Sequence, residues 1–88
     1  MFMKYRSRTE ITAMILDTSI KETTKIKIMY NAYLSYNQVK EYLSILTENN
    51  LIEYIEGART YKTTEKGLNF LKMHREMAAL LHTTVKND

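Results

Sequence analysis

The sequence predicts a single, mainly α-helical domain that carries one small β-hairpin and ends in a long helix. Three observations support this fold class. The chain has 88 residues, no proline and only two glycines, Gly57 and Gly67, and so few interrupting residues favour helices. Apolar residues recur at spacings of three and four in several segments, which is typical of amphipathic helices. One stretch rich in β-branched and aromatic residues surrounds Gly57 and indicates a hairpin.

Two helices are predicted in the first third of the chain. The first covers about residues 9–20 and begins with Thr9 as its capping residue. Its apolar face is predicted to contain Ile11, Met14, Ile15 and Thr18. The second helix is short and begins at Thr24. Its inward stripe is predicted to contain Ile26, Met29 and Tyr30, with Ile28 beside it.

A turn over residues 31–34 leads to a third helix that begins at Ser35. Ser35 and Gln38 have the spacing of a capping box, in which each side chain bonds the backbone of the other residue. The pair Asn49–Asn50 ends this helix. Its buried face is predicted to contain Val39, Tyr42, Leu43 and Leu46, with Ile45 alongside. A helix, a short helix, a turn and a capped helix form a tri-helical helix-turn-helix.

The predicted hairpin pairs residues 51–56 with residues 59–63 across a two-residue connection, Gly57-Ala58. A hairpin directly after the third helix is the wing of a winged helix. Thr64 is predicted to cap a final helix that runs to about residue 81. The expected domains are a winged helix-turn-helix with a basic N-terminal arm (1–63), a C-terminal dimerisation helix (64–82) and a flexible tail (83–88).

The composition is mildly basic and argues against several classes of site. Thirteen Lys and Arg residues against ten Asp and Glu residues give a net charge of +3. No cysteine is present, which excludes disulfides, thiolate metal sites and a cysteine nucleophile. His74 and His82 are too widely spaced for a metal pair, and no phosphate loop or nucleophile motif is visible. We therefore expect no enzyme activity, no metal and no cofactor.

The sequence also gives an expectation for the compartment. No apolar stretch approaches the roughly 20 residues that a membrane span needs, and no signal peptide is visible at the N-terminus. We therefore expect a cytoplasmic, nucleoid-associated protein that has no membrane partner and no small-molecule ligand.

Seven short motifs occur in a distinctive order over residues 6–75. They are Arg8–Ile11, Thr24–Tyr30, Ala32–Tyr36, Tyr42–Leu43, Leu51–Tyr54, Tyr61–Leu68 and Phe70–Leu71. This ordered set resembles the archaeal winged helix-turn-helix family of small DNA-binding proteins. The resemblance implies a dimeric, chromatin-associated protein or transcription regulator whose last helices pair as an antiparallel coiled coil. The final helix here is shorter than in members with a long coiled coil, so parallel and antiparallel pairing both stay open.

A DNA-contacting surface is predicted around the start of the third helix, since this part of a helix-turn-helix enters the major groove. The side chains expected to contact DNA are Tyr36, Asn37, Gln38 and Lys40, with Ser44 one turn further on. The alternative is that these residues form an ordinary capped helix start whose polar side chains face solvent. Gln38 is ambiguous because capping and base contact compete for one side chain.

Further cations are expected to contact the DNA backbone without reading its sequence. They are Arg59 and Lys62 on the wing, Lys25 and Lys27 on the second helix, and Arg6 and Arg8 in the N-terminal arm. The alternative for each is an ordinary solvated charge.

The last helix carries an apolar stripe at heptad spacing, which suggests a pairing surface. The stripe contains Phe70, Met73, Met77 and Leu80. Leu68 and Leu71 are expected to cover the first turns of the helix against the body of the domain. The stripe either folds back onto the same domain or meets its copy in a second subunit, and we expect dimerisation because an uncovered apolar end is adhesive.

The predicted function is binding of double-stranded DNA as a homodimer, most simply as a transcription regulator. A chromatin-like packaging protein is one alternative, but packaging normally uses a stronger positive field than +3 per chain. A winged-helix adaptor for protein–protein interaction is a second alternative, from a different class.

Overall fold

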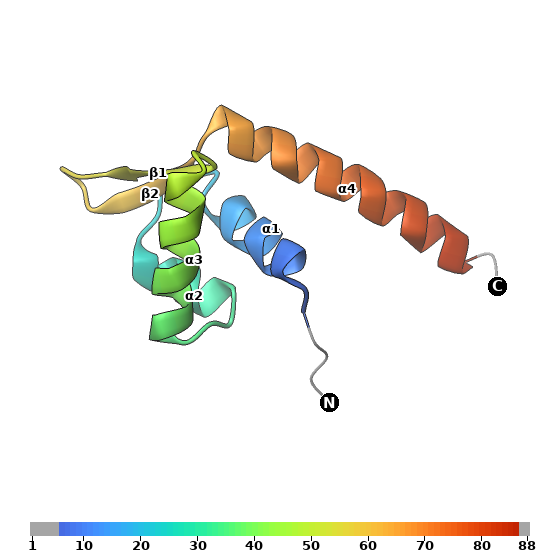
Figure 1. Ribbon diagram of the computed structural model, residues 1–88, viewed down its shortest axis with the longest axis horizontal. Coiled ribbons are helices and arrows are strands. Elements are labelled where there is room, and N and C mark those ends of the chain that lie inside the picture. Colours follow the sequence, from blue (N-terminus) through green and yellow to red (C-terminus); the bar gives the residue numbers. More distant parts are fainter. Residues whose placement is uncertain (1–5, 87–88) are drawn as a thin grey trace.

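The computed structural model describes residues 6–86, with side chains described through residue 81. Within these residues it contains four helices and one two-stranded antiparallel sheet (Figure 1). The elements are α1 (Arg8–Thr18), α2 (Lys25–Asn31), α3 (Tyr36–Glu48), β1 (Ile52–Ile55), β2 (Thr60–Thr63) and α4 (Glu65–Lys86). The predicted fold class is confirmed. Residues 1–5 of the predicted basic arm and residues 87–88 of the predicted tail lie outside the described part.

Hydroxyl side chains begin α2 and α3 at the predicted positions. Thr24 caps α2 by accepting a hydrogen bond from the backbone N–H of Lys27 at 3.3 Å. Ser35 accepts one from the N–H of Gln38 at 3.1 Å, and the Gln38 side chain accepts one from the N–H of Ser35 at 2.9 Å. The predicted capping box of α3 is therefore confirmed.

α1 begins and ends earlier than predicted. Its N-cap is Ser7 rather than Thr9, because Ser7 and Glu10 form a second capping box. A capping box satisfies two free backbone N–H groups, so it is favoured over a single hydroxyl at Thr9. The helix also ends two residues before the predicted end, where the backbone leaves the helix at Ser19. The Ser19 hydroxyl is buried and donates to the carbonyl of Ile15 at 2.9 Å.

α2 and α3 end in the same way, each with a residue in the left-handed region. Tyr33 follows α2 with a φ of 55°, and Asn50 follows α3 with a φ of 62°. In the first case the N–H of Leu34 donates to the carbonyl of Met29 at 3.0 Å, and α3 closes with the equivalent bond. These Schellman turns satisfy the last carbonyls of each helix. The turn at Tyr33 produces the tight α2–α3 connection that the sequence predicts.

β1 and β2 form the wing, but its strands are shorter than predicted. Ile55 pairs with Thr60 at the end of the ladder, and four residues, Glu56–Arg59, connect the strands instead of the predicted two. The left-handed residue of this loop is Arg59, with a φ of 58°, and not Gly57. A left-handed residue at the end of a hairpin loop returns the chain to the second strand.

A polar contact fixes the wing to the body of the domain. The buried Thr63 hydroxyl donates to the carbonyl of Leu16 at 2.6 Å, and its backbone N–H donates to the carbonyl of Ser19 at 2.9 Å. Thr23, in the α1–α2 linker, forms an antiparallel bridge with Tyr61. Together these bonds hold the base of the wing against the end of α1.

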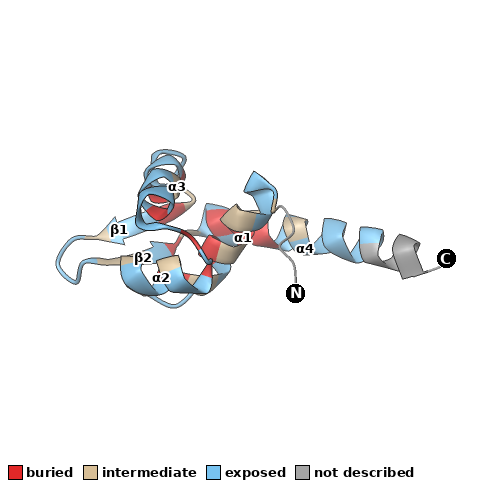
Figure 2. Cartoon of the chain, turned by 90° about the horizontal axis from the view of Figure 1, so that it is seen from below, coloured by how far each residue is buried: buried red, intermediate tan, exposed pale blue. Residues whose placement is uncertain are grey.

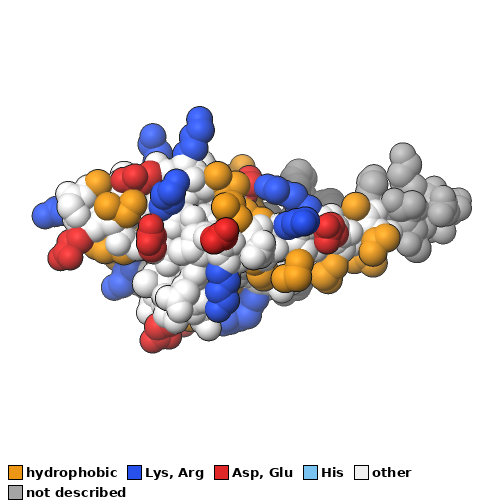
Figure 3. Space-filling view, turned by 90° about the horizontal axis from the view of Figure 1, so that it is seen from above, with side chains coloured by type: hydrophobic (Ala, Val, Ile, Leu, Met, Phe, Trp, Pro, Cys, Tyr) orange, Lys and Arg blue, Asp and Glu red, His pale blue; other side chains and the backbone are white. Residues whose placement is uncertain are grey.

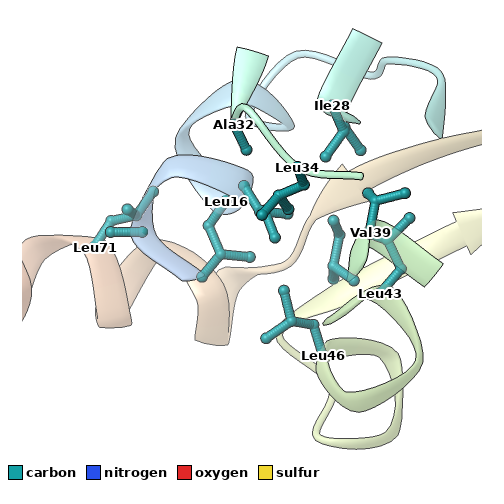
Figure 4. Packing of buried hydrophobic residues seen from close by; sticks show 11 residues of the cluster. Leu16, Ile28, Ala32, Leu34, Val39, Leu43, Leu46 and Leu71 are labelled. Atoms are coloured by element: carbon teal, nitrogen blue, oxygen red, sulfur yellow. The ribbon is translucent and has the colours of Figure 1, made fainter. Parts of the chain in front are cut away.

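The core lies between α1, α2, α3 and the base of the wing, with one contribution from α4 (Figure 4). Its buried members are Ala13, Ile15, Leu16, Ile28, Ala32, Leu34, Val39, Leu43, Leu46, Ile52 and Leu71. The predicted buried face of α3 is confirmed at Val39, Leu43 and Leu46, with Tyr42 half-buried. Ile45 is exposed.

The predicted inward stripe of α2 is wrong at Ile26 and Tyr30 and correct at Met29. Ile28 is fully buried, whereas Ile26 is 48% and Tyr30 is 68% exposed. Both lie two residues from Ile28, which places them about 200° from it around the helix. Met29 is half-buried against the core, as predicted.

α4 starts beside the wing and extends beyond the rest of the domain (Figures 1 and 2). Thr64 caps it as predicted by accepting from the N–H of Gly67 at 3.1 Å. Its first turns contact α1, where Leu71 is buried and Arg75 forms an ion pair with Asp17 at 2.9 Å. The predicted cover by Leu68 is wrong, since that side chain is exposed.

The reason for this difference is the close approach of Gly67 to the body of the domain. Gly67 and Leu71 are four residues apart and lie on one face of α4, and both are buried. Leu68 lies beside this buried face on the helix surface, and its side chain is exposed. α4 also continues to Lys86 rather than ending near residue 81, so residues 83–86 of the predicted tail are helical.

Candidate nucleic-acid interface

The outward face of α3 carries three of the predicted DNA-contacting side chains together. Asn37, Lys40 and Ser44 lie at spacings of three and four, on the side of the helix opposite its buried face. They line a shallow hollow of about 610 Å³ together with Glu41 and Ile45. All five side chains are exposed. The arrangement leaves amide, ammonium and hydroxyl groups free to meet a partner along one helix face.

Gln38 is engaged at the helix start. Its side-chain oxygen accepts from the N–H of Ser35 in the capping box. The amide nitrogen is therefore the part of the side chain still free to contact a partner. The structure thus places Gln38 mainly in a structural role, and its predicted DNA contact stays a prediction.

The two lysines of α2 point in different directions. They are two residues apart, which places them about 200° from each other around the helix. Only Lys25 reaches α3, where its Nζ lies 5.2 Å from the ring centroid of Tyr36. Lys27 is exposed on another side of α2. α2 therefore contributes one cation, Lys25, to the surface around α3.

Arg6 is held by the protein itself. Its guanidinium donates to the carbonyl oxygens of Ala32 at 2.6 Å and Tyr33 at 3.0 Å, and also contacts the sulfur of Met14 at 3.2 Å. These bonds clamp the start of the described chain to the α2–α3 turn. A phosphate contact by Arg6 would compete with them, so we leave Arg6 out of the proposed interface.

Arg8 lies on a different side of α3 from the outward face. Its guanidinium carbon is 5.8 Å from the ring centroid of Tyr42. Tyr42 is two residues from Lys40 and therefore points in nearly the opposite direction. The structure does not bring Arg8 together with Asn37, Lys40 and Ser44.

The wing separates its two predicted cations. Arg59 lies exposed in the loop at the tip. Lys62 lies opposite Glu53 in the ladder, and its Nζ is 3.5 Å from the carbonyl of Ile20. Since neighbours in a strand point to opposite faces, Lys62 is on the face of the wing that does not carry Tyr61.

A second hollow, of about 420 Å³, lies between α3 and the wing. It is lined by Lys25, Lys40, Leu43, Ser44, Thr47, Glu48, Tyr54 and Tyr61. The rings of Tyr54 and Tyr61 form an aromatic pair across the strands, with centroids 5.0 Å apart. Lys40 and Ser44 line both hollows, so they form the ridge between them.

Sequence reasoning did not include Ile45, Tyr54 and Tyr61 among the candidate site residues. Ile45 comes one residue before the buried Leu46. A helical-wheel projection from Val39 and Leu43 places it outside the buried face of α3. Tyr54 and Tyr61 are identified only by the ladder register, which places them opposite each other. No local pattern in the sequence supplies that register.

Two further properties bear on the class of site. Among the described residues, no group of three His, Asp or Glu side chains is placed to hold a metal ion. His74 lies against the ring of Phe70, with centroids 6.3 Å apart, and the side chain of His82 lies outside the described part.

None of the helices over residues 6–86 combines the length and the apolar character needed to cross a membrane.

Comparisons with known proteins agree with the winged helix fold. No curated protein sequence matches the chain significantly. The solved structure of a ZitR variant from Lactococcus lactis is similar, with a TM-score of 0.69 and 22% sequence identity. The match covers 98% of this chain, which spans 65% of the ZitR chain. Kinship with archaeal members in particular stays a prediction. A search of protein families matches residues 5–82 to "Winged helix-turn-helix", and the chain therefore belongs to the winged helix-turn-helix family.

Proposed function

We propose that the protein binds double-stranded DNA and regulates transcription as a homodimer. The observation that carries the proposal is the outward face of α3, where Asn37, Lys40 and Ser44 are exposed together on the second helix of the motif. In helix-turn-helix proteins this helix enters the major groove. The family assignment makes the same element the first candidate.

The side chains on this face suit base edges. Asn37 can form paired hydrogen bonds with adenine, and Lys40 can donate to the acceptors of guanine or to a phosphate. Ser44 can donate or accept, and Ile45 can contact the methyl group of thymine. Glu41 repels phosphate and is compatible with DNA where it accepts from the amino group of cytosine.

Cations around this face would bind the DNA backbone. Lys25 lies beside the start of α3, and Arg59 lies at the tip of the wing. Lys27, Lys62 and Arg8 lie away from the outward face of α3, and their backbone contacts stay predictions. These contacts position a protein on DNA but carry no sequence information.

The homodimer is proposed to form through α4. Met73 and Met77 are 58% and 60% exposed, and Leu80 and Leu81 are exposed beyond them. Figure 3 shows hydrophobic side chains gathered along one edge of this helix. Met73 is two residues from the buried Leu71, so the stripe points away from the body of its own domain. Phe70, the first residue of the predicted stripe, is half-buried against its own core and would contribute only its exposed edge.

A two-fold dimer would present two α3 helices to one duplex, with half-sites about one helical turn or a multiple of it apart. We favour regulation over general packaging, because a net charge of +3 per chain is a weak field for sequence-independent binding. In a cell we expect the protein on the nucleoid, in the cytoplasm.

A protein–protein adaptor is the second candidate, and one observation favours it. Ile26, Tyr30 and Tyr33 are exposed at spacings of four and three on α2 and its turn. Such a stripe is typical of a helix that binds another protein. An adaptor would not need the exposed amide and ammonium groups of α3, and this difference separates the two functions.

The test is fluorescence anisotropy of a labelled random-sequence duplex with the wild type, Lys40→Gln and Lys72→Gln. The wild type should bind at micromolar concentration or tighter at low salt. Lys40→Gln should weaken binding several-fold, whereas Lys72→Gln, an equal charge change on α4, should have little effect. Absence of binding by the wild type at low salt would overturn the proposal and make the adaptor the leading candidate.

A selection experiment with a randomised duplex then separates regulation from packaging. Enrichment of a two-fold symmetric motif is expected for a regulator, and Asn37→Ala should relax the preference at one base position of each half-site. Binding without any enriched motif would favour packaging.

A further inference from the structure

Two lysines from different helices end at the same aromatic ring. The Nζ of Lys25, on α2, lies 5.2 Å from the ring centroid of Tyr36, and the Nζ of Lys40, on α3, lies 5.4 Å from it. Tyr36 is the first residue of α3 and is half exposed. The aromatic ring attracts both ammonium groups through its quadrupole. The ring is therefore an attractive partner for two positive charges that repel each other.

Within the part of the chain whose side chains are described, neither lysine has a carboxylate partner. The ion pair found there is the one between Arg75 and Asp17 on the other side of the molecule. Glu41 lines the hollow on the outward face of α3 with Lys40, but it does not line the hollow that Lys25 and Lys40 share. Glu48 lines the same hollow two turns further along the helix. The Tyr36 ring is thus within cation–π distance of both ammonium groups, both lysines line one hollow, and an anion bound between them would relieve their repulsion.

The surroundings of the pair identify the anion. Both lysines line the hollow between α3 and the wing, together with the hydroxyl-bearing side chains of Ser44 and Thr47 and the Tyr54–Tyr61 pair. The Ser44 hydroxyl beside two ammonium groups suits a phosphate, whereas the Thr47 hydroxyl already donates to the carbonyl of Leu43 at 2.6 Å. Flat tyrosine faces next to it suit the sugar that adjoins a phosphate in a nucleic-acid backbone. Lys40 also lines the outward face of α3, so this hollow adjoins the proposed base-reading surface.

We propose that Lys25 and Lys40 together bind one phosphodiester of the DNA backbone, and that Tyr36 is the positioning residue that holds them there. This inference rests on the proposed function and deepens it. It makes the specific claim that α2 and α3 share a single phosphate. The alternative is that each lysine contacts a phosphate of its own.

Salt dependence distinguishes these two arrangements, because the slope of log K against log salt changes by about 0.9 for each phosphate contact. The experiment measures this slope with a duplex for the wild type, Lys25→Gln, Lys40→Gln and the double variant. A shared phosphate predicts small slope changes in the single variants and a loss of about 0.9 in the double variant. Separate phosphates predict a loss of about 0.9 in each single variant and about 1.8 in the double variant, which would overturn the inference.

Lys27→Gln is the matched control, since it removes the same charge from the same helix on another side. Its effect should add to that of Lys40→Gln, whereas the effects of Lys25→Gln and Lys40→Gln should not add. Tyr36→Leu should weaken binding several-fold in the wild-type background and have no further effect in the Lys25/Lys40 double variant. Tyr36→Phe, which keeps the ring, should bind like the wild type.

Two other outcomes are decisive. If dAMP at matched ionic strength displaces the duplex from the wild type but not from the double variant, the hollow takes a free nucleotide and its assignment to the DNA backbone is wrong. If the wild type binds no duplex at low salt, the proposed function fails, and that result is distinct from a wild type that binds with additive lysines. Circular dichroism melting curves of each variant confirm that these exposed substitutions leave the fold intact.

Discussion

Gly67 lies where the chain leaves the wing and enters α4, and it approaches another backbone closely. A Cβ atom at this position would lie 2.2 Å from the carbonyl oxygen of Leu51 and 2.6 Å from Cγ2 of Thr63. The Leu51 oxygen also accepts a hydrogen bond from the N–H of Thr64 at 3.1 Å, so it is fixed in place. Glycine is therefore required here for close contact, even though the residue is in a helix, where glycine is ordinarily unfavourable.

Gly67→Ala should lower the free energy of unfolding by about 1–3 kcal/mol, because the added methyl group forces α4 away from the base of the wing. This loss should occur although alanine has the higher helix propensity. Urea denaturation followed by circular dichroism measures it. Gly57→Ala is the control, since nothing lies within 4 Å of its added Cβ atom. The control should change stability by less than about 0.5 kcal/mol. Equal losses in the two variants would contradict the account.

Single residues could be predicted from the sequence where their role depends on near neighbours. Asn37, Lys40 and Ser44 follow from the start of α3 and the spacing of a helix face. The role of Arg6 does not, because its partners are the carbonyls of Ala32 and Tyr33, far along the chain.

Among the elements, α3 matters most for function, and its start is fixed by the Ser35–Gln38 capping box. Asn37 and Lys40 lie in the first turns after this cap, so fraying of the helix start would displace them. The cap thus links a local hydrogen bond to the geometry of the proposed interface.

Ser35→Ala should cost about 1 kcal/mol of stability, the usual loss for an N-cap hydroxyl, and should also weaken duplex binding. Ser44→Ala is the matched control, because it removes an exposed hydroxyl from the same helix without touching a cap. It should leave the thermal unfolding midpoint nearly unchanged. A Ser35→Ala variant that melts like the wild type would show that the cap does not hold the helix start.

The starts of α2, α3 and α4 could be predicted because capping residues are local signals. The other boundaries could not be predicted from the sequence. α1 starts at a second capping box that competes with Thr9, and the wing loop takes its left-handed residue at Arg59, which is not a glycine. The burial of Ile28 instead of Ile26 and Tyr30 depends on how a helix of seven residues turns against its neighbours.

At the scale of the whole molecule, the winged helix and the far part of α4 are separate surfaces. The body presents α3 and the wing, whereas α4 extends beyond α1 with mostly exposed residues (Figure 2). Its exposed apolar stripe lies in this part of the helix. The sequence predicts the stripe through its heptad spacing but not the length of the helix, since its polar last residues look like a tail. Heptad spacing alone does not predict pairing of the stripe, because pairing depends on contacts between two subunits.

Met77→Glu should convert the proposed dimer into a monomer, because a carboxylate in the middle of the stripe would be buried without a partner. Light scattering coupled to size-exclusion chromatography measures the mass of the particle. Ala79→Glu places the same charge on another side of α4 and should leave the dimer intact. A wild type that is monomeric at micromolar concentration, or a dimer that tolerates Met77→Glu, would show that α4 does not pair in this way.

The central claim is that duplex DNA docks on the outward face of α3, and amide chemical shifts measured by NMR during titration with a short duplex test it most directly. The account predicts that the largest shifts occur in α3 from Tyr36 to Ile45, at Lys25 and in the wing near Arg59. Amides of α4 around Met77 should shift little. Shifts confined to α4 or to the exposed side of α2 around Tyr30, or no shifts at low salt, would contradict it.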